Sequence, residues 1–390
     1  MFQKKLMLVS CLLCSLGLLV AQERIGLRIG NYSGSNGMAL NPAQHVTSQV
    51  AWDVHLAGAG VFFENSYGYL ENVSLLDLYR SRGTFDLYTR PILEGAPTSA
   101  NPLYLDFPQG SNRTYYGDLN LDILGPGFMV KLKTGHSFGM FTRFRTAGSA
   151  RISNSLGFYN YYFYPENKDL LVEPMRMGTM AWGELGFNYG YSWETQVGTF
   201  GFGVNLRYLQ GFEAIYFENL EQLTLQKKND QDIDIEELHA RFGFTETNTS
   251  GEAFDLQRNG GGFGVDAGIM LTGDGQGDLY QWKFGAALID IGSVRFFRNV
   301  QTHRVDVEDG LYLDGLPFQD LDSTDFLNAA VLEFSFQALQ DSLESLSLNA
   351  FTMALPSALS IQGEYAITDH LMVHGLWVQS LPFSPIAVHR

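Results

Sequence analysis

Residues 128–145 read Phe-Met-Val-Lys-Leu-Lys-Thr-Gly-His-Ser-Phe-Gly-Met-Phe-Thr-Arg-Phe-Arg. In the first third of this stretch, Phe128, Val130 and Leu132 occupy every second position. After the polar turn at 134–137, apolar residues return at every second position from Phe138 onward. A period of two predicts strands with one apolar and one polar face. The stretch therefore predicts an antiparallel β-hairpin.

The same alternation recurs along most of the chain. We expect a first strand at 50–56, another at 119–123, and hairpins over 185–208, 263–288 and 359–379. Their tight turns lie near 135, 196, 275 and 369, and the long polar connections cover about 64–115, 148–180, 211–258 and 301–350. Short turns on one side and long loops on the other are typical of an outer-membrane β-barrel. We expect the long connections to be solvated loops, with 326–346 helical.

The N-terminus has the pattern of a secretory signal peptide. Lys4 and Lys5 precede an apolar run over 6–20, and Ala21 offers a small residue for cleavage. A membrane anchor would need about 20 apolar residues, and lipoprotein processing at Cys11 would leave almost no hydrophobic region. We expect a signal peptide at 1–21, an N-terminal segment at 22–47 and a β-barrel with long extracellular loops at 48–390.

Composition agrees with a barrel and argues against two classes of function, nucleic-acid binding and cysteine chemistry. Aromatic residues make up 14% of the chain, with 29 Phe and 19 Tyr, which suits a lipid-facing band and interfacial girdles. The net charge of −17 argues against nucleic acid, whose partners present a basic face. Cys11 and Cys14 both lie in the signal, so the mature chain has no disulfide, Cys-ligated metal or Cys nucleophile.

The motifs that suggest chemistry are better explained as turns. Residues 135–139, Gly-His-Ser-Phe-Gly, match the hydrolase pattern G-x-S-x-G. That pattern requires a strand-to-helix turn, whereas two strands flank it here. We therefore expect no enzymatic activity.

Two acidic clusters raise the question of calcium. Asp230, Asp232 and Asp234 have the spacing of a calcium loop but lack its glycine and closing glutamate. Asp274 and Asp278 are equally explained by a glycine-rich turn. The histidines are scattered, and we expect neither a metal nor a cofactor.

Five charged residues fall on the polar faces of neighbouring hairpins. They are Arg143, Arg145, Arg207, Glu184 and Asp266. If these faces point into the lumen, the residues form charged pairs there. Such pairs are either structural cross-strand contacts or a charged patch that guides a solute.

The segment Gly30–Ala43 precedes the first strand and is too polar for lipid. We expect it inside the barrel as a hatch that includes Pro42. Its asparagines Asn31, Asn36 and Asn41 would bond to inward polar side chains such as Arg143 and Arg207.

Several motifs carry a resemblance to known barrels. Asn41-Pro42-Ala43 resembles the start of FadL-like outer-membrane proteins, which include the long-chain fatty-acid transporter and the PorV-type barrels of Bacteroidota. The runs 125–129, 142–145, 207–211 and 288–292 are similar to those of an uncharacterised Bacteroidota barrel family. The resemblance implies an antiparallel transmembrane β-barrel of about fourteen strands in the outer membrane of a Gram-negative bacterium. The C-terminus lacks the usual terminal aromatic, so we expect the sequence to be truncated there.

Two functions remain open at this point. One is a gated channel for a small or hydrophobic solute. The other is a non-transporting scaffold that binds partner proteins at the cell envelope. In both cases outer-membrane lipid surrounds the chain.

Overall fold

The computed structural model describes most of the chain beyond residue 32. The described residues are 33–48, 50–70, 86–90, 102–106, 114–153, 165–219, 221–229, 231–246, 257–273, 280–319, 321, 326–347, 350–368 and 371–381. The expected signal peptide, Asn31, Asp230, Asp274 and Asp278 lie outside these ranges.

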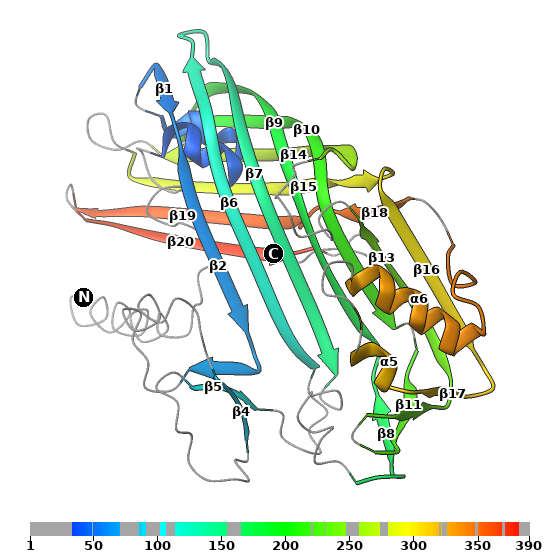
Figure 1. Ribbon diagram of the computed structural model, residues 1–390. Helices are drawn as coiled ribbons and strands as arrows, with labels where there is room; N and C mark the ends of the chain where they lie inside the picture. Colours follow the sequence, from blue (N-terminus) through cyan, green and yellow to red (C-terminus); the bar gives the residue numbers. More distant parts are fainter. Residues whose placement is uncertain are drawn as a thin grey trace, which may run out of the picture.

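A single antiparallel sheet dominates the molecule and curls into a trough (Figure 1). Its strand order is β1-β6-β7-β9-β10-β14-β15-β19-β20, and β2 pairs with β6 beside β1. The bounds are β1 Trp52–His55, β2 Gly58–Asn65, β6 Thr114–Lys131, β7 His136–Ser153, β9 Met175–Thr195, β10 Gly198–Asn219, β14 Gly260–Gly273, β15 Trp282–Phe296, β19 Ala358–Thr368 and β20 Leu371–Ser380. The prediction of an all-β, antiparallel, barrel-like fold is confirmed.

The hairpins have the register that the alternation predicts. In β6–β7, Phe128 lies opposite Met140 and Val130 lies opposite Phe138, so apolar residues meet on one face. Since successive strands of this path run antiparallel, the tight turns near 135 and 196 lie at one end of the sheet, and those near 275 and 369 fall outside the described residues. The long connections lie at the other end.

The outer face of the sheet is apolar, whereas the inner face carries buried charged and polar side chains, glycines and some large apolar side chains such as Trp182 and Met270. Strand β10 shows the pattern most clearly: Leu206 is 58% exposed on the outer face, whereas its neighbours Asn205 and Arg207 are 0% and 2% exposed. This is the reverse of a soluble sheet, in which apolar residues are hidden from solvent.

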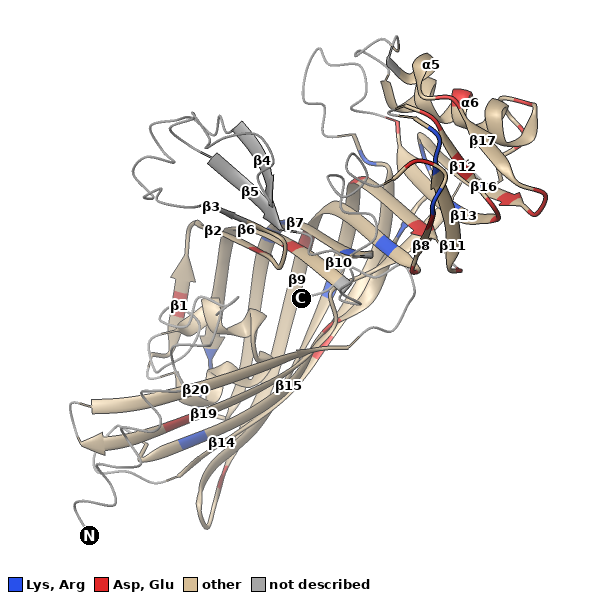
Figure 2. Cartoon of the chain, turned by 90° about the horizontal axis from the view of Figure 1, so that it is seen from below, with Lys and Arg blue, Asp and Glu red and all other residues tan. Residues whose placement is uncertain are grey.

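The long connections fold into a subdomain of their own, contrary to the expectation of solvated loops. A four-stranded sheet contains β8 Asp169–Val172, β11 Leu223–Lys227, β12 Ile233–Ile235 and β17 Leu311–Leu313. Strand β13 Leu238–Thr245 pairs with both β10 and β16 Val300–Val307, and helices α5 Leu316–Gln319 and α6 Phe326–Leu339 complete it. We call these eight elements the cap. Figure 2 shows them together at one end of the main sheet.

The cap has a continuous apolar core, which explains why these connections are ordered. Side chains from all three connections meet there. Its buried members are Leu170, Val172, Leu223, Leu225, Ile235, Leu238, Ala240, Val305 and Leu311. Helix α6 packs against this core through Phe334 and Leu339. The helix ends at Leu339, earlier than the expected end at 346.

A further connection also contains strands where a polar loop was expected. Strands β3 Gly68–Leu70, β5 Pro102–Asp106 and β4 Asp86–Arg90 form a three-stranded sheet between β2 and β6. Pro102 is the first residue of its strand, a position that tolerates the missing N–H. The proline-rich composition of 64–115 therefore did not exclude strands.

The described strands form a curled wall rather than a closed cylinder. Among the described residues, β20 pairs only with β19, and β1 and β2 pair only with β6. The closed barrel of about fourteen strands that the resemblance implies is thus not completed by these strands. No helix in the described part of the chain is long and apolar enough to cross a bilayer.

Candidate functional site

The segment before β1 lies in the trough, against the inner face of the sheet (Figure 1). It forms two 3₁₀ helices, η2 Gly34–Ala39 and η3 Pro42–Thr47. Asn41 caps the second, since its Oδ1 accepts a hydrogen bond from the N–H of Ala43 at 2.9 Å, and Pro42 supplies the favourable first position. Nearly every residue over 33–48 is buried. We call residues 33–48 the plug.

Amide side chains of the wall hold the backbone carbonyls of the plug. Asn205 Nδ2 donates to the carbonyl of Met38 at 2.9 Å, and Asn188 Nδ2 donates to that of Pro42 at 3.0 Å. In return, Asn41 Nδ2 donates to the carbonyl of Ile269 at 3.1 Å. These bonds connect the plug to β9, β10 and β14, and they satisfy the buried carbonyls of Met38, Pro42 and Ile269.

Glycines on the inner face make room for the plug. A Cβ on Gly203 would lie 2.2 Å from the carbonyl oxygen of Pro42, and one on Gly268 would lie 2.2 Å from Asn41 Oδ1. A Cβ on Gly139 would lie 2.9 Å from Met38 Sδ. Any side chain at Gly203 or Gly268 would therefore displace the plug.

A latch joins the plug to the first strand. Ser35 N donates to Asp53 Oδ2 at 2.8 Å, and its hydroxyl also contacts Asp53 and, at 2.8 Å, His55 Nδ1. Here the serine lies between the acid and the histidine. A hydrolytic triad places the histidine in the middle, so this arrangement is a structural tie.

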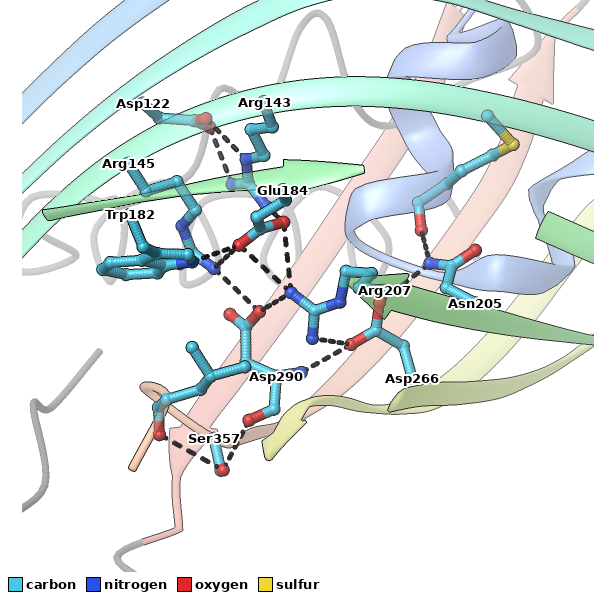
Figure 3. Close-up of polar contacts among 12 residues, drawn as sticks. Asp122, Arg143, Arg145, Trp182, Glu184, Asn205, Arg207, Asp266, Asp290 and Ser357 are labelled. Carbon is cyan, nitrogen blue, oxygen red and sulfur yellow. Dashed lines mark hydrogen bonds and ion pairs between the residues drawn. The ribbon is translucent and has the colours of Figure 1, made fainter. Parts of the chain in front are cut away.

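A cluster of buried charges lies beside the plug (Figure 3). Its members are Asp122, Arg143, Arg145, Glu184, Arg207, Asp266 and Asp290, and each is less than 9% exposed. Arg143 binds Asp122 in a bidentate manner, with Nε–Oδ1 at 2.6 Å and Nη2–Oδ2 at 2.8 Å. The cluster joins strands β6, β7, β9, β10, β14 and β15.

Arg145 and Arg207 share two carboxylates at the centre of the cluster. Both Nη1 atoms lie 3.3 Å from Glu184 Oε1, and they approach Asp290 Oδ1 at 2.7 and 2.6 Å. Arg207 Nη2 also binds Asp266 Oδ1 at 2.7 Å. A planar guanidinium suits such multiple contacts because its donors are fixed in a fork.

Asp290 reaches the cluster through an irregular backbone. It has φ +59°, and the β14–β15 register shifts between Val265 and Ala267. Its N–H donates to Asp266 Oδ1 at 2.6 Å, and Ser357 Oγ donates to its carbonyl at 2.7 Å. These contacts compensate a backbone conformation that few non-glycine residues adopt.

Asn205 couples the cluster to the plug. The same Nδ2 that donates to Met38 also donates to Asp266 Oδ2 at 2.8 Å, while Oδ1 accepts from Asn188 at 2.8 Å. A displacement of the plug would therefore remove a bond next to Arg207. The arrangement can transmit the position of the plug to the charge cluster.

The site residues predicted from the sequence divide into the charged residues of the wall and the residues of the plug. The charged residues come together in the cluster: they are Arg143, Arg145, Glu184, Arg207 and Asp266. Asn41 of the plug does not reach the arginines as expected, because its side chain bonds to the carbonyl of Ile269 and to the N–H of Ala43. The guanidinium groups of Arg143 and Arg207 bind Asp122 and Asp266, so the expected bond from Asn41 to them is not formed, and Asn31 lies outside the described residues.

Asp122 and Asp290 were missed as cluster members. Asp122 alternates with Leu121 and Ile123, which is the signal of an inward residue. Asp290 had no such signal, because the irregular backbone breaks the alternation. Asn36 is half-buried in the plug.

The calcium candidates within the described ranges have other contacts. Asp232 accepts a hydrogen bond from Tyr312 at 2.7 Å, and Asp234 pairs with Lys228 at 2.7 Å. In the same part of the chain, no group of three or more His, Cys, Asp or Glu side chains is arranged to hold a metal ion.

Comparison with known proteins assigns the chain to a family. A model of a family of unknown function (DUF5723) matches residues 42–386, most of the chain. The chain belongs to that family. A search of curated proteins finds no match.

Proposed function

We propose that this member of a family without assigned function is an integral outer-membrane β-barrel protein of a Gram-negative bacterium, of the FadL/PorV-like type. In this proposal residues 1–21 are its signal peptide. The wall surrounds a passage for a small or hydrophobic solute, and the plug closes that passage at rest.

The apolar outer face supports the membrane location. Along β10 the outward side chains from Phe200 to Tyr208 are all apolar or aromatic, and Gln210 is the first polar one. Ten residues rise about 33 Å. At a tilt of about 40° they span about 25 Å, the height of the apolar band of outer-membrane barrels.

Aromatic residues border this band as interfacial girdles do. Near the tight turns, Tyr191 lies 5.7 Å from Trp193, and Trp193 lies 4.8 Å from Phe200. At the other border, Phe144 lies 5.8 Å from Phe212. Tyr and Trp favour the membrane–water interface because their apolar rings carry a polar O–H or N–H group, whereas Phe144 and Phe212 extend the apolar part of the band.

An apolar face of this extent is unusual for a soluble monomer. It continues across neighbouring strands, where Phe263 is 73% exposed and Phe187 is 53% exposed, and soluble proteins rarely expose large contiguous apolar patches. Lipid also imposes a requirement: every strand edge within it must be hydrogen-bonded. The proposal therefore requires that the edges at β1–β2 and β20 be paired in the membrane.

The proposal of a gated passage rests on one observation. The described plug residues are held by side-chain contacts, and they do not pair with the wall as a strand of the sheet. The ties of the plug are amide–carbonyl bonds, the Ser35 latch and apolar contacts of Met38 and Val46 with the wall. Each hydrogen bond typically contributes about 0.5–1.5 kcal/mol. The plug can therefore leave without breaking the strand pairing of the wall.

The scaffold function is favoured by a different observation, the folded cap. Three connections that share one core present a stable surface to a partner. In that alternative the plug remains in place permanently.

Conductance of the full chain in planar bilayers separates the two functions. Gly203→Val should expel the plug and raise single-channel conductance, and deletion of 33–47 should do the same. Gly363→Ala is the control, because a Cβ there meets nothing within 4 Å. If both plug variants fold, shown by heat-modifiable migration on gels, and conduct no more than the wild type, the gated passage is wrong.

A further inference from the structure

The cap exposes an apolar surface next to many carboxylates. We propose that this surface docks a basic amphipathic segment of a partner protein. The inference goes beyond the barrel function and holds whether or not the passage conducts.

The surface consists of one side of α6 and the turns after it. Its members, which we call the docking face, are Phe326, Leu332, Phe336, Leu343 and Leu346. Phe336 is 50% exposed and Leu343 is 63% exposed. The opposite side of α6 is occupied, since Val331 is buried and Phe334 packs on the cap core.

Helix α6 is therefore apolar on the side that it does not need for folding. A helix that only covers a core has a polar outer side. The chain from Phe326 to Leu339 contains a single charged residue, Glu333. A helix with this composition is expected where a second apolar surface covers it.

Charge defines the partner that covers the docking face. Residues 301–350 contain ten acidic residues and one arginine, a net charge of −9. Figure 2 shows acidic residues on α6 and on neighbouring elements of the cap. Glu333, Asp341 and Glu344 lie on the same helix and the following turns as the docking face.

The carboxylates exclude two other occupants. A second copy of the cap would bring two faces of net negative charge together, which costs free energy. An anionic lipid headgroup would be repelled in the same way. A segment with apolar residues on one side and Lys or Arg on the other matches both features, as in other helix-in-groove complexes.

Fluorescence anisotropy with a designed peptide tests this proposal. The probe is a labelled helical peptide with Leu on one face and Lys on the opposite face. A peptide of the same composition in scrambled order is its control. The protein is the full chain in mild neutral detergent. We expect the amphipathic peptide to bind at least tenfold more tightly than the scrambled one, with affinity falling as salt rises.

Two sets of variants locate the contact. Phe336→Ser with Leu343→Ser should weaken binding at least tenfold, and Glu333→Gln with Glu344→Gln should reduce the salt dependence. Leu171→Ser, at a residue 55% exposed on β8, should change neither. Phe336, Leu343 and Leu171 are each at least 50% exposed, and Glu333 and Glu344 do not belong to the cap core. The variants should therefore retain heat-modifiable migration.

Three results would overturn the proposal. The first is equal binding of the amphipathic and scrambled peptides. The second is unchanged binding by the Phe336→Ser, Leu343→Ser variant. The third is self-association of the wild type that the same variant abolishes, which would assign the face to a second copy. A conductance change in the plug variants has no bearing on these outcomes.

Discussion

Leu206→Arg is the substitution that best separates a lipid-facing wall from a water-facing one. Leu206 points outward from β10, and its direct neighbours across the sheet are Phe187 and Val265. No carboxylate stands opposite to pair with an introduced arginine. Six residues from Phe200, it lies about 15 Å above the tight-turn border of a band about 25 Å high. It is therefore near the middle of the membrane.

The expected cost follows from this depth. An arginine at the midplane of a barrel's lipid face costs about 2–4 kcal/mol, and one near the interface costs about 0–1 kcal/mol. The folded-to-unfolded ratio should fall roughly 30- to 700-fold for Leu206→Arg, since about 1.4 kcal/mol is tenfold. In water the same exposed position would change stability by no more than about 0.5 kcal/mol.

Urea titration of the protein folded into phospholipid vesicles measures the difference. Gln210→Arg, on the same strand and face but at the border, is the matched control for charge, and Leu206→Ala controls for the lost side chain. A Leu206→Arg protein as stable as Gln210→Arg would refute the lipid-facing assignment.

Two further predictions concern the buried charges and the cap. Arg207→Met should destabilise the wall by about 3–5 kcal/mol, because it removes the arginine that pairs with buried Asp266, while Glu184 and Asp290 keep Arg145. Adding Asp266→Asn should cost less than the sum of the two single substitutions in the same urea titration, and strict additivity would show that the two residues are not coupled. In the cap, burial lowers the pKa of His303 to about 4. The folded state thus favours the neutral ring, so stability is full above pH 6.5 and falls by up to about 3 kcal/mol as the pH drops from 6.5 to 4. Hydrogen exchange of cap amides should show this loss, His303→Gln should remove it, and an equal pH dependence in that variant would exclude His303 as its origin.

The sequence allowed the wall to be predicted because its signal is local. The alternation in β6–β7 and β9–β10 fixes both strand type and face, and the intervening turns fix the register. Arg143, Arg145 and Arg207 could be assigned to the inner face by counting alone. Their partners were less accessible, since Asp290 depends on a backbone irregularity that breaks the count.

The cap could not be predicted for a different reason. Leu223, Leu225 and Ile235 lie in a segment so acidic that its alternation resembles a solvated loop. Their partners come from two other connections, at 169–172 and 311–313. Pairing of short strands over such separations leaves no local signal.

The plug lies on the inner side of the sheet, as expected, but Asn41 contacts the carbonyl of Ile269 and not an arginine. The inward glycines of the wall that make room for the plug are visible in the sequence, as in Phe200-Gly201-Phe202-Gly203-Val204 of β10. A repeated glycine on the inner face of a strand indicates a close approach of another backbone. That signal, and not the arginines, indicated where the plug binds.

Cysteine labelling on whole cells tests the membrane-embedded wall most directly. The expected mature chain has no cysteine, so single cysteines at Asp309 in the cap, at Leu206 in the wall and at Val197 in a tight turn report without background. The account predicts that an impermeant maleimide labels Asp309→Cys on intact cells and Val197→Cys only after lysis, and that Leu206→Cys reacts only after detergent denaturation. Labelling of Leu206→Cys in intact membranes, or recovery of the protein in the soluble fraction, would contradict it.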